Sequence, residues 1–104
     1  MLKWGRFFGV ELYLLVIYDI SDDELRVKVA DFLKSRGLVR VQRSAFIGPG
    51  STALKRDVEA GLRRLVQGRS GVNIQLFLLT SACYKTRGVV GDVRYEWDGG
   101  LVVT

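Results

Sequence analysis

Residues 12–18 (LYLLVIY) form an uninterrupted run of seven apolar side chains. A run of this length that includes β-branched residues is typical of a β-strand that is buried on both of its faces. A second segment, residues 72–80 (VNIQLFLLT), is also strongly apolar on both sides. Strands of this kind belong inside a sheet whose two faces are both covered. The next question is therefore which parts of the chain can cover each face.

Two segments between these strands have the apolar spacing of amphipathic helices. Ser21 and Glu24 form a capping-box pattern at the start of the first helix, and Gly37 marks its end. The second helix begins at Ser51 or Thr52. The apolar stripes are Leu25, Val29, Phe32 and Leu33 in the first helix and Leu54, Val58, Gly61, Leu62, Leu65 and Val66 in the second.

Residues 38–47 alternate in the manner of strands, and the Gly-Pro-Gly sequence at residues 48–50 predicts a turn after them. A short strand ending near Val41 and a longer one starting at Arg43 fit this pattern, and so does one bent strand. Val39, Val41, Ala45 and Ile47 project to one side, whereas Leu38, Arg40, Gln42, Ser44 and Phe46 project to the other.

The predicted order is strand, helix, strand material, helix, strand, in a single domain of 104 residues. A lead over residues 1–9 precedes it, and a Gly-rich tail over residues 81–104 carries β-like runs at 89–90 and 101–103. Each helix is about 10 Å wide, so two of them can cover only one face of the sheet. A second copy of the chain is the economical cover for the other face, because most soluble oligomers are two-fold homodimers.

The composition limits the kinds of binding partner and active site that the chain can have. Sixteen Lys and Arg against eleven Asp and Glu give a net charge of +5, which favours a polyanionic partner. The absence of His and the presence of one Cys exclude imidazole bases, intrachain disulfides and thiolate zinc clusters. Glu11 interrupts the N-terminal apolar stretch, so we expect no membrane span and a cytoplasmic location. The reactive group that this composition favours is a hard metal ion held by oxygen ligands. Magnesium needs only one or two protein carboxylates.

Asp19 is the candidate carboxylate. It directly follows the apolar strand and precedes the helix, a place where a charged group normally needs a partner. A two-fold axis would bring two such side chains together, and the ion between them could activate water or stabilise charge on a phosphate oxygen. Tyr18 points to the other side of the strand, where core packing is its ordinary role.

Arginine and aromatic side chains accompany this carboxylate. Arg26 lies near the same end of the predicted sheet, and Arg40 and Arg43 lie on the second strand segment. The guanidinium fork suits phosphate oxygens. The alternative is a solvated basic face, which is the preferred interpretation for Arg36, Arg63, Arg64 and Arg69. Phe46 lies on the Arg40 side, where it could stack a nucleobase or contact a partner copy.

Two sequence blocks resemble the CRISPR-associated protein two family, the small spacer-acquisition subunit. The first is VIYDISDD at residues 16–23, followed by Leu25 and Arg26. The second is GLVRVQRSAF at residues 37–46, which contains the family pattern R-[VI]-Q-x-S-[VA]-F. The blocks stand in the family order and at the family spacing, and the similarity extends over roughly residues 11–80.

The resemblance implies an α+β fold, a ferredoxin-like βαββαβ sandwich with an extra C-terminal strand, homodimeric through its sheet faces and with tail strands pairing onto the partner. It also implies magnesium (Mg2+) at the paired aspartates, endoribonuclease or DNase activity, and a CRISPR-associated integrase as partner. By motif, Asp19 would be the metal ligand, and Tyr18, Arg26 and Arg40 would complete the catalytic site. Nucleic-acid contacts would come from Arg26, Lys28, Arg40, Arg43 and Phe46, and Lys28 stands where some relatives have Arg.

Two functions follow from these expectations. One is a magnesium-dependent nuclease that acts on RNA or DNA in CRISPR adaptation. The other is a non-catalytic dimeric scaffold that binds duplex DNA and bridges integrase subunits. Both need the same basic surface and the same dimer, so the sequence does not separate them. A small-molecule regulatory domain would need polar specificity residues around a pocket, and the sequence marks none.

Overall fold

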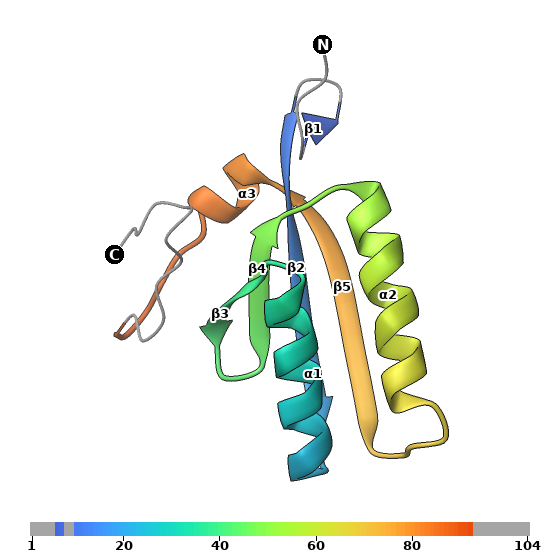
Figure 1. The fold of residues 1–104 in the computed structure, drawn as a ribbon. Coiled ribbons are helices and arrows are strands. Elements are labelled where there is room, and N and C mark those ends of the chain that lie inside the picture. Colours follow the sequence, from blue (N-terminus) through green and yellow to red (C-terminus); the bar gives the residue numbers. More distant parts are fainter. Residues whose placement is uncertain (1–5, 8–9, 93–104) are drawn as a thin grey trace.

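The computed structural model describes residues 6–7 and 10–92 (Figure 1). Its main sheet is antiparallel with the strand order β5-β2-β4-β3, and a short strand β1 pairs with the start of β2. The elements are β1 (Arg6–Phe7), β2 (Val10–Ile20), α1 (Asp23–Ser35), β3 (Val39–Gln42), β4 (Ala45–Pro49), α2 (Thr52–Val66), β5 (Val72–Thr80) and α3 (Ser81–Lys85). The order β2-α1-β3-β4-α2-β5 is the ferredoxin-like βαββαβ fold, which confirms the predicted fold class.

Strand β2 lies in the interior of the sheet, as its uninterrupted apolar sequence predicts. It pairs with β4 on one side and along residues 12–20 with β5 on the other. Because side chains alternate along a strand, its even-numbered residues face the helices and its odd-numbered residues face away from them. Val16 is fully buried on the helix side, and Asp19 is exposed on the opposite side.

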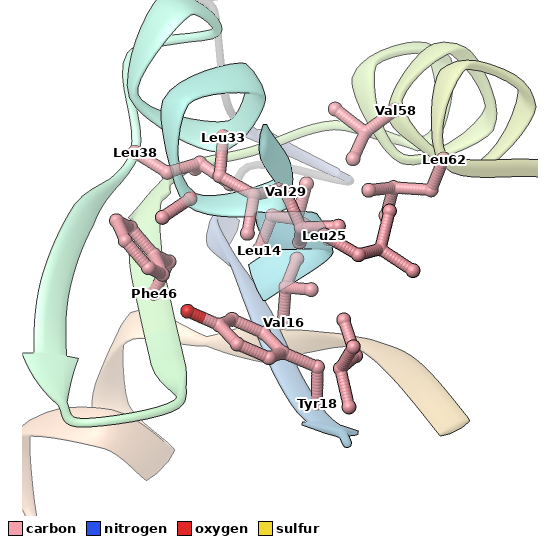
Figure 2. Close-up of a cluster of buried hydrophobic side chains, with 12 residues drawn as sticks. Leu14, Val16, Tyr18, Leu25, Val29, Leu33, Leu38, Phe46, Val58 and Leu62 are labelled. Atoms are coloured by element: carbon pink, nitrogen blue, oxygen red, sulfur yellow. The ribbon is translucent and has the colours of Figure 1, made fainter. Parts of the chain in front are cut away.

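The main core lies between the sheet and the two long helices (Figure 2). Its β2 residues pack against the two predicted helical stripes, which confirms the spacing of both helices. The buried members are Leu14, Val16, Tyr18, Ile20, Leu25, Val29, Ala30, Leu33, Leu38, Phe46, Val58 and Leu62.

Residues 38–47 form two strands joined by a tight turn, so the alternative of one bent strand is wrong. β3 and β4 pair across this turn with a register shift between Arg40 and Gln42. The carbonyl of Ser44, in the turn, accepts a hydrogen bond of 2.9 Å from the Tyr18 amide. Strand β4 continues to Pro49, beyond the predicted end, because Gly48 and Pro49 still pair with β2.

The predicted capping box at the start of α1 is wrong. Asp22 is the N-cap, and its carboxylate accepts a hydrogen bond of 2.7 Å from the Leu25 amide. Ser21 instead bonds to the loop before β5: its amide and hydroxyl donate to the Gly71 carbonyl at 3.0 and 3.2 Å. Ser51 caps α2, as one of the two predicted alternatives stated.

The second face of the sheet is covered only in part. A small cluster of Tyr13, Ile47 and Tyr84 lies on it, and Tyr84 comes from α3, a helix that the sequence did not predict. Farther along this face Phe77 is 40% exposed. The two long helices therefore cover one face only, as predicted.

Most predictions for the two ends of the chain fall on residues outside the described part of the structure. Residues 89–90 form no strand within the described part of the chain. The run at 101–103 and the predicted lead at 1–9, apart from residues 6–7 in β1, lie outside the described residues. Between residues 10 and 92, no helix is long and apolar enough to cross a membrane.

Candidate functional site

Asp19 is the penultimate residue of β2, and its cross-strand neighbour is Asn73 at the start of β5. The side chain is exposed on the face that the long helices leave open. Among the described residues, it forms no hydrogen bond or ion pair. A carboxylate with no cationic partner is available to a ligand, so the donor fits a hard cation.

The described part of one chain does not provide a metal site with several protein ligands. The described residues contain no group of three or more Asp, Glu, His or Cys side chains that could hold a metal ion. An ion such as magnesium retains several waters and tolerates one or two protein carboxylates, so Asp19 suits it only if a second carboxylate or a substrate oxygen joins it.

Tyr18 lies on the opposite face of β2, packed in the main core. Its ring stacks on that of Phe46, with centroids 6.3 Å apart and planes inclined by 23°, and its hydroxyl is directed toward that ring (Figure 2). Burial raises the pKa of the Tyr18 hydroxyl above its usual value of 10.0, while the charges of Arg40 and Arg26 lower it. The hydroxyl therefore stays protonated at neutral pH.

Arg26 fixes the first turn of α1 to the strand end that carries Asp19. Its guanidinium donates a hydrogen bond of 3.0 Å to the Ile20 carbonyl and forms an ion pair with Asp23. Because the Ile20 carbonyl is one residue beyond Asp19, this contact holds the arginine at the same end of the sheet. The remaining guanidinium surface is partly exposed and can meet an anion.

Arg40 and Arg43 lie at the β3–β4 turn. The Arg40 guanidinium donates a hydrogen bond of 2.6 Å to the Arg43 carbonyl. It also lies 4.9 Å from the centroid of the Phe46 ring, a cation–π distance. Arg43 itself is exposed at the turn. Arg40 thus stabilises the turn and covers the edge of the core.

Phe46 does not have the accessible role that was predicted for it. Its side chain is 0% exposed, enclosed by the chain's own helices and by Tyr18 and Arg40. No ring face remains for a nucleobase or for a partner copy. The alternation placed Phe46 on the correct face, but that face is the one the two long helices cover.

Most of the predicted site residues line one cleft of about 650 Å³ between α1 and the β3–β4 turn. Neither Phe46 nor Lys28 belongs to the lining, and Lys28 is an exposed residue elsewhere on α1. The lining consists of Tyr18, Asp19, Ile20, Asp23, Arg26, Val27, Ala30, Asp31, Lys34, Arg40, Arg43 and Ser44.

The sequence prediction missed part of this cleft. The α1 residues that line it recur on successive turns of the helix, at positions 23, 26 and 27, 30 and 31, and 34, so they form one helical stripe that includes Arg26. That spacing is visible in the sequence and could have identified Lys34. Asn73, by contrast, becomes a neighbour of Asp19 only through the β2–β5 register, which no local pattern predicts.

A second contact holds the Asp19 end of the sheet in place. Arg69, in the loop after α2, forms an ion pair of 3.1 Å with Asp22. Together with the two hydrogen bonds from Ser21 to Gly71, it ties the β2–α1 corner to the α2–β5 loop. The backbone around Asp19 is therefore fixed from β5 as well as from α1.

The fold and the site define a small ferredoxin-like protein with an open apolar sheet face, an exposed carboxylate at one end of it and an arginine-lined cleft beside that carboxylate. The model of the family described as CRISPR associated protein Cas2 matches residues 12–87. The chain belongs to the Cas2 family.

Named relatives agree with this assignment, and a solved structure shares the fold. A CRISPR-associated endoribonuclease Cas2 from Korarchaeum cryptofilum is 42% identical over 84% of this chain and 92% of its own length. A CRISPR-associated endonuclease Cas1/endonuclease Cas2 fusion from Thermoproteus tenax is 40% identical over 66% of this chain and 26% of its own. The crystal structure of the hypothetical protein TT1823 from Thermus thermophilus has a TM-score of 0.65 and 32% identity, covering 85% of this chain and all of that one.

Proposed function

We propose that this protein is a metal-dependent nuclease of CRISPR adaptation that cleaves phosphodiester bonds of RNA or DNA, with Asp19 as its magnesium ligand. The observation that carries the proposal is the exposed Asp19 carboxylate, which has no partner among the described residues. Relatives named CRISPR-associated endoribonuclease support the reaction class.

A homodimer formed through the open sheet faces would complete the site. That face carries the exposed Phe77 and the partly buried Leu15 and Ile17, and Asp19 follows them at its margin. Two copies related by a two-fold axis bury the apolar part and bring both carboxylates to the edge of the interface. The carboxylates then repel each other unless a cation or a proton lies between them.

The chain's own residues would bind and orient the nucleic acid. Arg26 and Arg43 line the cleft next to Asp19 and match phosphate oxygens, and the exposed Lys28 extends the basic surface along α1. Arg40 holds the turn that carries Arg43, and Tyr18, whose ring is buried in the main core, lines the same cleft. Magnesium, when bound, would supply the positive charge that stabilises the phosphate oxygens during cleavage.

A second candidate function is a non-catalytic dimeric scaffold that bridges integrase subunits on duplex DNA. The relative that is named a Cas1 and Cas2 fusion favours it, because a fusion joins proteins that work in one assembly. The net charge of +5 suits duplex DNA as well as RNA.

The test is a cleavage assay on labelled RNA and on labelled duplex DNA, with magnesium and with a chelator. The protein and its Asp19→Asn variant are compared side by side. Cleavage by the unmodified protein only with magnesium, and none by the variant, supports the nuclease. Cleavage that persists in chelator or in the variant rules out Asp19 as the ligand. No cleavage by the unmodified protein under any condition favours the scaffold.

A further inference from the structure

Asn73 is the side chain nearest in register to the candidate metal ligand. The β2–β5 ladder places it directly opposite Asp19, and both residues are exposed. Facing residues in an antiparallel pair project from the same side of the sheet, with Cβ atoms about 4.5–5.5 Å apart. The Asn73 carboxamide therefore stands beside the carboxylate on the open face.

Gln75 determines which end of the Asn73 carboxamide is available. Residues two apart on a strand share a face, and the Gln75 Nε2 donates a hydrogen bond of 3.1 Å to the Asn73 Oδ1. The oxygen is thereby engaged, and the Nδ2 group keeps two N–H donors that have no partner among the described residues. Asp19 thus has an oriented neutral donor next to it.

We propose that Asn73 is a substrate-binding residue of the Asp19 site, and that its Nδ2 donates to a non-bridging phosphate oxygen of the nucleic acid. Gln75 is its positioning residue. This inference rests on the proposed nuclease function and adds a substrate contact to the same site.

A neutral donor suits this position for an electrostatic reason. An Arg or Lys opposite Asp19 would form an ion pair with the carboxylate and neutralise the charge that a metal ion requires. A carboxamide binds the phosphate anion by hydrogen bonds and leaves the carboxylate charge intact. A carboxylate in place of the carboxamide would repel the phosphate.

The experiment measures RNA binding in the Asp19→Asn background, where cleavage is not expected, by fluorescence anisotropy at one fixed salt concentration. Asn73→Val removes the donor and suits an exposed strand position, so the fold is retained. We expect it to weaken binding about five- to tenfold. Asn73→Asp keeps the shape, removes the donor and adds a negative charge, so we expect a larger loss. Unchanged binding in both variants, or tighter binding by Asn73→Asp, would overturn the proposal.

Two further variants separate the roles. Gln67→Ala removes an exposed carboxamide at the end of α2 and serves as the matched control, with binding expected within twofold of the parent. Gln75→Ala should weaken binding when Asn73 is present and have no further effect when Asn73 is already Val. An equal loss in both backgrounds would contradict the positioning role of Gln75.

The outcome of the RNA-binding comparison does not depend on whether the protein cleaves nucleic acid. If the unmodified protein shows no cleavage, the proposed nuclease function fails, yet the binding comparison still decides whether Asn73 contacts the nucleic acid. If the unmodified protein cleaves and Asn73→Val cleaves with an unchanged KM, the nuclease stands and the Asn73 proposal fails.

Discussion

Tyr18 and Asp19 are adjacent in the chain and lie on opposite faces of the same sheet. The Tyr18 ring is buried with Phe46 under α1, whereas the Asp19 carboxylate stands exposed on the open face beside Asn73. Asp19 also lines the cleft that contains Arg26 and Arg43, so its carboxylate borders both the open face and the cleft at the end of β2. A ligand held by Asp19 is therefore next to Asn73 at the start of β5 and next to the arginines of the cleft.

Phe46→Ala should destabilise the monomer fold. Truncation of a fully buried Phe typically costs about 3–5 kcal/mol, because it removes apolar burial and leaves a cavity. It also removes the surface on which Tyr18 and Arg40 pack. Urea unfolding followed by circular dichroism measures the loss. Phe77→Ala is the matched control, because that ring is already 40% exposed. Equal midpoints for the two variants would contradict the burial of Phe46.

Phe77→Asp should prevent assembly of the proposed dimer and leave the subunit folded. The open face carries this ring, and a charge placed in an apolar interface is unfavourable unless it is paired. Sedimentation velocity measures the oligomeric state. The control is Val27→Asp, a substitution of an exposed apolar residue (59%) on α1, away from the open face. A dimer that survives Phe77→Asp, or one that both variants disrupt equally, would contradict assembly through this face.

Much of the architecture could be predicted from the sequence because burial determines it. The apolar run in β2 and the two helical stripes each specify a strand or helix, and together they place the long helices on one face. What could not be predicted depends on longer-range geometry. Ser21 is a residue type that is favoured at an N-cap. Its hydroxyl nevertheless donates to the carbonyl of Gly71, fifty residues away, and Asp22 caps the helix instead.

The same distinction applies to the site. The sequence identifies Asp19 because a charged carboxylate next to a buried strand normally needs a partner. The helix cap does not involve Asp19, so it does not provide that partner. Phe46 was misassigned because alternation defines a face but does not say what covers it. Asn73 was missed because its proximity to Asp19 comes only from strand register.

Nucleic-acid binding should weaken as salt rises. Contacts from Arg and Lys to phosphates release counterions, so the logarithm of the affinity falls linearly with the logarithm of the salt concentration. With a net charge of +5 per chain, we expect a clear decrease between ~50 and ~200 mM salt and little dependence on sequence. Anisotropy titrations with two unrelated RNA sequences test both points. An affinity that is independent of salt would argue against phosphate contacts.

Alkaline pH should destabilise the fold through Tyr18. Burial raises the pKa of its hydroxyl in the folded state above the usual 10.0, so the unfolded chain loses this proton first. The free energy of unfolding is then independent of this group below pH 10 and decreases as the pH rises above it. Tyr18→Phe should reduce the decrease between pH 9 and 11, as measured by urea unfolding. Burial also raises the pKa of Tyr13, so Tyr13→Phe is measured beside it. A slope that neither variant changes would contradict this explanation.

Gly71→Ala should destabilise the protein more than Gly68→Ala does. Both glycines have positive φ, of 69° and 75°, so each Ala variant carries the left-handed strain of about 1–2 kcal/mol. A Cβ at Gly68 meets nothing within 4 Å, whereas a Cβ at Gly71 would collide with the Ser21 hydroxyl oxygen. The difference between the two variants therefore measures the contact that ties the β2–α1 corner to the α2–β5 loop. Adding Ser21→Gly to Gly71→Ala should recover part of that difference, because it removes the oxygen that collides. Equal unfolding midpoints for Gly71→Ala and Gly68→Ala would mean that this contact does not hold the Asp19 end of the sheet in solution.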